Sequence, residues 1–200
     1  MVISDHPEAA PLHLQVRYLG EALDCNPNAH ALLVVGAELG LPNWYFGAGA
    51  VAQTVWNVRH GFDPAAGIRD YDLAYFDPRD QSAETERRIE AEVAGRLSEL
   101  GIAVDVKNQA RVHLWYAERF GPGIEPYRST EEAIATWPTT ASSVGVRRDG
   151  ERLEVCAPFG LADLIGMVAR PNKGTVTREV YEEKTSRWAV LWPALRVIPW

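Results

Sequence analysis

The stretch from Trp44 to Asp77, WYFGAGAVAQTVWNVRHGFDPAAGIRDYDLAYFD, decides the fold of this chain. An apolar run at 44–46 leads into the turn Gly47-Ala48-Gly49, which precedes a helix-forming run over residues 50–59. A loop rich in Gly, Asp and Pro then leads to a β-rich run over residues 72–77. This order predicts a strand, a glycine turn, a helix, a loop and a second strand.

The glycine turn is a candidate phosphate-binding element. Glycine tolerates positive φ and lets a ligand approach the backbone, while the free N–H groups and the positive dipole end of the following helix favour an anion. Gly47, Ala48 and Gly49 are therefore candidates for binding a nucleoside triphosphate. The same turn suits a plain structural corner equally well, so the motif alone leaves both interpretations open.

Two aspartates stand at alternate positions where the second strand begins, in Asp70-Tyr71-Asp72. Successive side chains of a strand point to opposite faces, so Asp70 and Asp72 would share one face. Carboxylates this close repel each other unless a cation lies between them, and such oxygen ligands suit Mg²⁺ in phosphoryl-transfer sites. An isolated pair of this kind is more often part of a solvated loop; the preceding glycine turn favours a metal site.

Length and composition favour a single domain over residues 1–200. The chain has 46% hydrophobic residues and seven tryptophans, which indicates a well-packed aromatic interior. Its net charge of −7 disfavours general affinity for long nucleic acids. Cys25 and Cys156 lack the spacing of a zinc site or a disulfide framework, no apolar run could span a membrane, and the start is not signal-like. We therefore expect a cytoplasmic protein that does not engage a membrane.

The N-terminal part of the chain has helical patterns. Residues 1–11 are expected to form a loose segment, and residues 12–40 to carry two helices. The first helix is predicted over residues 12–23 and the second over residues 27–39, which Gly40 follows as a stop signal.

A charged helix and another strand follow the central stretch. Residues 82–100 have an amphipathic pattern, and their charged residues are expected to form a solvated face. A strand is predicted over residues 102–108, so this helix would connect two strands of one sheet. If Asp105 of that strand faces the same side as the aspartate pair, it could bind a metal or accept a proton from an attacking hydroxyl. The alternating pattern could equally place Asp105 in solvent.

The block KNQARVHLWY over residues 107–116 is dense in recognition chemistry. Lys107 and Arg111 could neutralise phosphate charge, and Asn108 or Gln109 could hydrogen-bond a sugar or base. His113 is a further candidate for substrate binding, although a lone histidine beside Leu114 and Trp115 is more often a packing residue than a catalyst.

The C-terminal half offers weaker signals. A hairpin is predicted around residues 147–152, and the hydroxyl residues at 139, 140 and 142 either line a pocket or serve turns. Asp163 is expected to have a structural role. A basic, aromatic tail ends the chain, and a helix over 178–188 in which glutamates pair with the basic groups explains it better than a polyanion site.

Six blocks of sequence, which cover roughly residues 43–200, form a combination more specific than the glycine turn or the aspartate pair alone. The blocks are GAGAVAQTVWN, DYDLAYFD, VKNQARVHLWY, YRSTEEAIATWP, APFGLADL and VLWPALRVIPW. Their combination resembles a bacterial nucleotidyltransferase-like family within the polymerase-beta-type nucleotidyltransferase superfamily.

The resemblance implies an α+β fold with a small mixed β-sheet backed by helices. In that superfamily a Gly-Gly or Gly-Ser turn cradles the triphosphate and three strand carboxylates hold two divalent ions. Carried over to this sequence, the turn is 47–49 and the carboxylates are Asp70 and Asp72, with Asp105 as the best match for the third. The sequence departs from the pattern at Ala48, which lacks the hydroxyl that commonly contacts a phosphate.

The residues and the resemblance together predict a metal-dependent nucleotidyltransferase. It would move a nucleoside monophosphate from ATP or another triphosphate to an acceptor hydroxyl and release pyrophosphate, with Mg²⁺ or alternatively Mn²⁺ as cofactor. The acidic charge favours a small molecule or a protein over a long nucleic acid as acceptor. Two alternatives remain open at this point: an inactive nucleotide-binding or interaction module on the same fold, and a phosphohydrolase.

Overall fold

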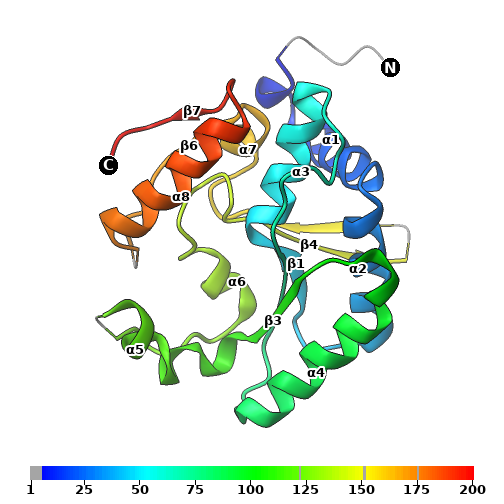
Figure 1. The fold of residues 1–200 in the computed structure, drawn as a ribbon, viewed down its shortest axis with the longest axis vertical. Helices are drawn as coiled ribbons and strands as arrows, with labels where there is room; N and C mark the ends of the chain where they lie inside the picture. The colour runs from blue at the N-terminus through cyan, green and yellow to red at the C-terminus, as the bar shows by residue number, and fades with distance from the viewer. Residues whose placement is uncertain (1–5, 122, 151, 175) are drawn as a thin grey trace.

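The centre of the molecule is a mixed five-stranded sheet with the strand order β3-β2-β1-β4-β5 (Figure 1). The computed structural model describes residues 6–121, 123–150, 152–174 and 176–200. The strands are β1 (Tyr45–Gly47), β2 (Tyr71–Tyr75), β3 (Val104–Asn108), β4 (Gly145–Asp149) and β5 (Arg152–Cys156). Only β2 and β3 run parallel, and every other neighbouring pair is antiparallel. The predicted α+β fold with a small mixed sheet is confirmed.

Helices α1 (Leu12–Asp24) and α2 (Pro27–Leu39) form where the sequence predicted them. The side chain of Asn26 accepts hydrogen bonds from the first backbone N–H groups of α2, and Gly40 ends this helix in the left-handed conformation. Residues 1–5 of the expected loose segment lie outside the described residues, and Pro7–Ala9 form a short 3₁₀ turn, η1.

The two faces of β2 have different partners. Tyr71, Leu73 and Tyr75 are buried in the main hydrophobic core, while Asp72 and Ala74 alternate with them and line a cavity on the other face. A strand was predicted over residues 72–77, and the structure ends it at Tyr75.

Helix α3 (Ala48–His60) follows β1 without a linker, so it begins two residues earlier than the sequence pattern predicted. Its Trp56 is fully buried against Trp188 and Trp192, with ring centroids 5.0 and 5.4 Å apart. The indole Nε1 of Trp192 donates to Asn57 Oδ1 at 2.7 Å. The expected aromatic interior is thus confirmed, and it ties α3 to the C-terminal helix α8 (Arg178–Leu191).

Helix α4 (Ala83–Arg96) connects the parallel strands β2 and β3, and Ser82 caps its first turn. The expectation that the charges of this helix form only a solvated face is wrong for two glutamates. Glu86 is buried and accepts a hydrogen bond from the backbone N–H of Asn108 at 2.8 Å, and Glu90 accepts from that of Val106 at 3.0 Å. Since β3 is an edge strand, its free N–H groups need such partners.

The remaining elements are short. They are η2 (Ser98–Leu100), η3 (Gln109–Leu114), α5 (Tyr116–Phe120), α6 (Thr130–Ile134), α7 (Ala162–Ile165) and the paired strands β6 (Val168–Ala169) and β7 (Arg196–Val197). In Figure 1, α5, α6 and α8 lie on the opposite side of the sheet from α2 and α4. No helix within the described residues is both long and apolar enough to cross a membrane.

Candidate active site

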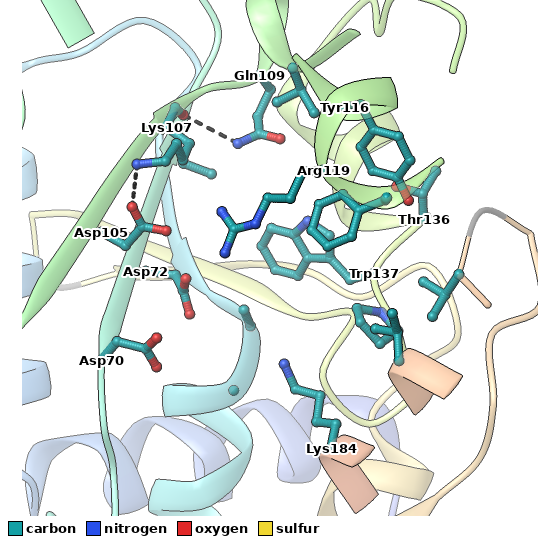
Figure 2. A pocket seen from close by; sticks show the side chains of 18 of the residues that line it. Asp70, Asp72, Asp105, Lys107, Gln109, Tyr116, Arg119, Thr136, Trp137 and Lys184 are labelled. Carbon is teal, nitrogen blue, oxygen red and sulfur yellow. Dashed lines mark hydrogen bonds and ion pairs between the residues drawn. The ribbon is translucent and has the colours of Figure 1, made fainter. Parts of the chain in front are cut away.

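A cavity of about 340 Å³ opens between the β2–β3 part of the sheet, the start of α3, and the segments around α5 and α8 (Figure 2). Asp70, Asp72 and Asp105 all line this cavity, as do Ala48 and Gly49. The structure therefore brings the glycine turn and the three predicted carboxylates together at one place.

The register of the parallel strands resolves the orientation of Asp105. Asp72 of β2 lies directly opposite Asp105 of β3, and Ala74 lies opposite Lys107. Side chains at paired positions of neighbouring strands point to the same face of a sheet. Asp105 therefore faces the cavity with Asp72, as Figure 2 shows, instead of facing solvent.

The environment of Asp72 disfavours its negative charge. Burial, with the added negative charge of Asp70, raises the pKa of Asp72 to about 7, although Lys184 opposes the shift. Among the described residues, no three His, Cys, Asp or Glu side chains converge closely enough to form a ready-made metal cluster. The donor chemistry still fits a hard divalent cation, because three carboxylates face one cavity and a cation would relieve the charge repulsion at Asp72.

Lys107 holds Asp105 in place. Its ammonium group pairs with the Asp105 carboxylate and donates to Glu90 Oε2 at 3.1 Å. Burial alone would lower the pKa of Lys107, but Asp105 and Glu90 outweigh it and raise this pKa. Lys107 thus lines the cavity as predicted, already engaged with the third carboxylate.

Gly47 permits a contact that no larger residue could make. A Cβ at this position would lie 2.7 Å from the carbonyl oxygen of Val144 and 2.8 Å from the Trp137 ring. The φ of Gly47 is −160°, an extended value open to any residue, so close packing is the reason for glycine here. This packing brings β1 against Gly145 of β4 and sets the start of α3 at the cavity.

Ala48 and Gly49 start α3 at the edge of the cavity. Ala48 has a φ of +57°, which is unfavourable for a residue with a Cβ, and such strain is typical of functional sites. No side chain caps the first N–H groups of α3. Gln53, one turn further on, lines the cavity with its side chain almost fully buried, and its Oε1 has no hydrogen-bond partner.

Four of the predicted substrate-binding residues do not line the cavity, and Gly47, which packs against Val144 and Trp137, is the first of them. Asn108 is fully buried, caps η3 and donates to the carbonyl oxygens of Asp77 and Asp80. Arg111 forms an ion pair with Glu86 at 2.6 Å. His113 is half-buried outside the residues that line the cavity. Asn108 and Arg111 contact the β2–α4 connection and α4 instead, while Gln109 and Val112 of η3 are the residues of this segment that line the cavity.

Two further groups of polar residues considered in the sequence have structural roles in the fold. Thr139 and Ser142 hydrogen-bond each other at 2.9 Å inside the protein and do not line the cavity. Asp163 accepts a hydrogen bond from Thr140 at 2.6 Å and pairs with Arg170, as expected for a structural role.

Cations from the C-terminal half also line the cavity. The expectation that glutamates pair with the basic groups of the C-terminal helix holds for Arg178 and is wrong for Lys184 and Arg187. Lys184 and Arg187 of α8 and Arg119 of α5 line it, and none forms an ion pair among the described residues. Burial lowers the pKa of Lys184, and the nearby charges of Asp72 and Asp70 act against that shift. Lys184 lies three residues after Tyr181 and four before Trp188, both buried, and this helical spacing was the available signal.

Aromatic side chains form the part of the cavity opposite the aspartates. Trp115, Tyr116, Phe120 and Trp137 line it, and we call these four residues the aromatic wall. Figure 2 shows Arg119 extending between this wall and Asp105. Gln109 also lines the cavity, with its Nε2 donating to the Lys107 carbonyl oxygen at 3.2 Å.

Comparisons with known proteins agree with this fold. Residues 35–197 match the model of a family described as nucleotidyltransferase, and the chain belongs to this family. The fold is also similar to a solved structure described as an NMR structure that reveals a CCA-adding enzyme head domain. The two chains share 25% sequence identity with a TM-score of 0.74, over 91% of this chain and 95% of the other. No match is found among curated proteins.

Family membership confirms the resemblance to nucleotidyltransferases that the sequence blocks indicated, and it makes nucleotidyl transfer the general class of function.

Proposed function

We propose that this protein is a metal-dependent enzyme that transfers a nucleoside monophosphate from a nucleoside triphosphate to an acceptor hydroxyl. One observation carries the proposal: a single cavity combines three aspartates, an uncapped helix start and three cations that form no ion pair among the described residues. Lys107 already pairs with Asp105, but the other three cations that line the cavity form no ion pair among the described residues, which leaves room for a ligand that carries both positive and negative charge. A metal–triphosphate complex has this property.

Asp70, Asp72 and Asp105 are the residues that would hold Mg²⁺, or alternatively Mn²⁺. When bound, the ion would supply positive charge that polarises the phosphate oxygens and stabilises the charge of the transition state. The support for this assignment is the one cavity that all three carboxylates line, with Asp72 and Asp105 on the same face of the sheet, and the cost of charging Asp72 without a counter-ion.

The start of α3 is proposed to bind the triphosphate. The N–H of Ala48 already donates to the carbonyl oxygen of Val144 at 3.1 Å, but that of Gly49 borders the cavity without a side-chain cap, and helix starts favour anions. Backbone N–H groups would therefore replace the missing serine hydroxyl at Ala48. Lys184 and Arg187 of α8 would bind the β- and γ-phosphates, because both line the cavity and neither forms an ion pair among the described residues.

The proposed reaction forms one bond and breaks one. The acceptor hydroxyl oxygen attacks the α-phosphorus, and the bond from that phosphorus to the bridging oxygen of the β-phosphate breaks, so pyrophosphate leaves with the electron pair. Asp105 would take the hydroxyl proton. Positioning and charge stabilisation are the main contributions required of the protein in such a transfer.

The test is calorimetric titration of the protein with ATP, GTP, CTP and UTP, with Mg²⁺ or with EDTA. We expect at least one triphosphate to bind in a metal-dependent manner and Asp72→Asn to weaken this binding at least about 100-fold. Asp149→Asn, at the exposed end of β4, is the matched control and should bind as the wild type does. Wild-type protein that binds no triphosphate in any condition would refute the proposal.

A second experiment separates transfer from the alternatives. The protein is incubated with the bound triphosphate, labelled at the α-phosphate, and a cell extract that supplies acceptors. Label in a new product together with released pyrophosphate supports transfer. Labelled monophosphate formed without an acceptor indicates hydrolysis, and binding without any turnover indicates an inactive nucleotide-binding module.

A further inference from the structure

We propose that the aromatic wall binds the base of the nucleotide by stacking. This inference rests on the proposed function, because it concerns the same cavity and the same substrate. The proposed function assigns the charged residues to the metal and the phosphates, and this inference assigns the aromatic wall to the base. The aspartates lie on the strand side and Lys184 on α8, while the aromatic rings come from residues 115–120 and from Trp137 after α6 (Figure 2). A nucleoside triphosphate has the same division into a charged tail and a flat, neutral base.

The rings of the aromatic wall are arranged as a cluster that still has accessible surface. The centroids of Tyr116 and Phe120 lie 4.9 Å apart, and that of Trp115 lies 6.4 Å from each. All three side chains are half-buried and line the cavity. The core tryptophans Trp56 and Trp188 are fully buried instead. Partly open rings beside a cavity can stack on a base, whereas core rings cannot.

Arg119 adds a second reason to place a base here. Its guanidinium lies 5.3 Å from the centroid of the Phe120 ring, and Figure 2 shows it inside the cavity between the aromatic wall and Asp105. A guanidinium plane stacks on bases and also attracts phosphate, so Arg119 would contact the nucleotide where base and phosphates meet.

Phe120 offers the sharpest test, because its side chain has no polar group whose loss would complicate the result. The probes are ATP and inorganic tripolyphosphate, each with Mg²⁺, since the second has the phosphates without the base. We expect Phe120→Leu to weaken ATP binding about tenfold, as measured for loss of a stacked base, and to leave tripolyphosphate binding unchanged. Phe120→Trp should restore the affinity for ATP.

Phe62, an exposed aromatic residue outside the cavity, provides the control, and Phe62→Leu should change neither affinity. Unchanged ATP binding in Phe120→Leu would overturn the inference, because the base would then not stack on the aromatic wall. An equal loss for both probes would also overturn it, because the effect would then not depend on the base. If wild-type protein bound neither probe, the proposed function itself would fail.

Discussion

The strand side and the helix side of the cavity are built in different ways. The strand side takes Asp72 from β2 and Asp105 from β3, whose backbones are hydrogen-bonded in register, and Asp70 from the residue directly before β2. The helix side takes its cations and rings from α5 and α8, which are distant in sequence and are positioned by side-chain packing such as that of Trp56 against Trp188. Backbone pairing between strands therefore fixes the positions of the aspartates proposed to bind the metal. Packing of the hydrophobic core fixes the positions of the cations and rings proposed to bind the nucleotide.

The comparison predicts that a change at the strand side which disturbs the backbone is the most damaging. In Gly47→Ala the new Cβ would lie 2.7 Å from a backbone oxygen of Val144, which cannot move away as a flexible side chain would. We expect the free energy of unfolding to fall by about 3 kcal/mol, as for severe overpacking, in chemical denaturation. Nucleotide binding should weaken too, because the start of α3 would shift.

Gly95 in α4 is the matched control, since nothing lies within 4 Å of a Cβ built there. Gly95→Ala should stabilise the protein by about 0.5–1 kcal/mol through helix propensity. If Gly47→Ala were as stable as the wild type, the close packing of β1 would not be what holds the strand side together.

The second prediction concerns the negative charge of the Asp72 carboxylate on the strand side. The pKa of Asp72 is about 7 in the folded protein, above its ordinary value near 4. A raised folded pKa contributes stability at low pH, and that stability is lost as the pH rises from about 4 through 7. In EDTA at pH 8, Asp72→Asn should therefore be more stable than wild type by about 2 kcal/mol, although it should lose metal-dependent binding.

Thermal unfolding of both proteins between pH 4 and 8 measures this difference. The melting temperature of the wild type should fall more steeply with pH than that of the variant, and Mg²⁺ at pH 8 should raise only that of the wild type. A variant that is less stable than the wild type at pH 8 without metal would contradict the charge repulsion inferred at Asp72.

The third and smallest effect belongs to the helix side. Lys184→Met keeps most of the apolar stem and removes the ammonium group, so we expect about tenfold weaker binding of the Mg²⁺–triphosphate complex, equivalent to about 1.4 kcal/mol. Lys184→Arg should retain more of the affinity. Titration calorimetry measures both variants.

Arg178→Met is the control on the same helix, because Arg178 is exposed and pairs with Glu182 at 2.8 Å. It should bind the triphosphate as the wild type does. Equal affinities for Lys184→Met and the wild type would show that the helix side contributes shape but not charge to binding.

Much of the fold could be predicted from local signals. Asn26 before α2, Gly40 after it and Ser82 before α4 are capping residues whose effect depends on a few neighbours, and the helices they bound were predicted closely. Glu86 and Glu90 were not understood from the sequence, because their role is to satisfy the N–H groups of a strand edge. That need exists only once β3 is at the edge of the sheet.

The candidate site divides in the same way. Asp70 directly precedes β2 and Asp72 lies within it, so the two aspartates are close in the chain and the sequence determined that they belong together. The orientation of Asp105 required the register between β2 and β3, and the position of Arg111 outside the cavity required its ion pair with Glu86 of α4. For Lys184, the sequence showed only a helical spacing relative to the buried residues Tyr181 and Trp188. It did not indicate which part of the protein Lys184 faces.

The sequence by itself determined the α+β class, the glycine turn, the acidic strand and the resemblance to nucleotidyltransferases, because these depend on residues close together in the chain. Only the tertiary structure decided which cations and rings face the aspartates across the cavity. The physical reason is that strand alternation and helix caps are short-range properties of the backbone, whereas the approach of α5 and α8 depends on the packing of a core to which the whole chain contributes.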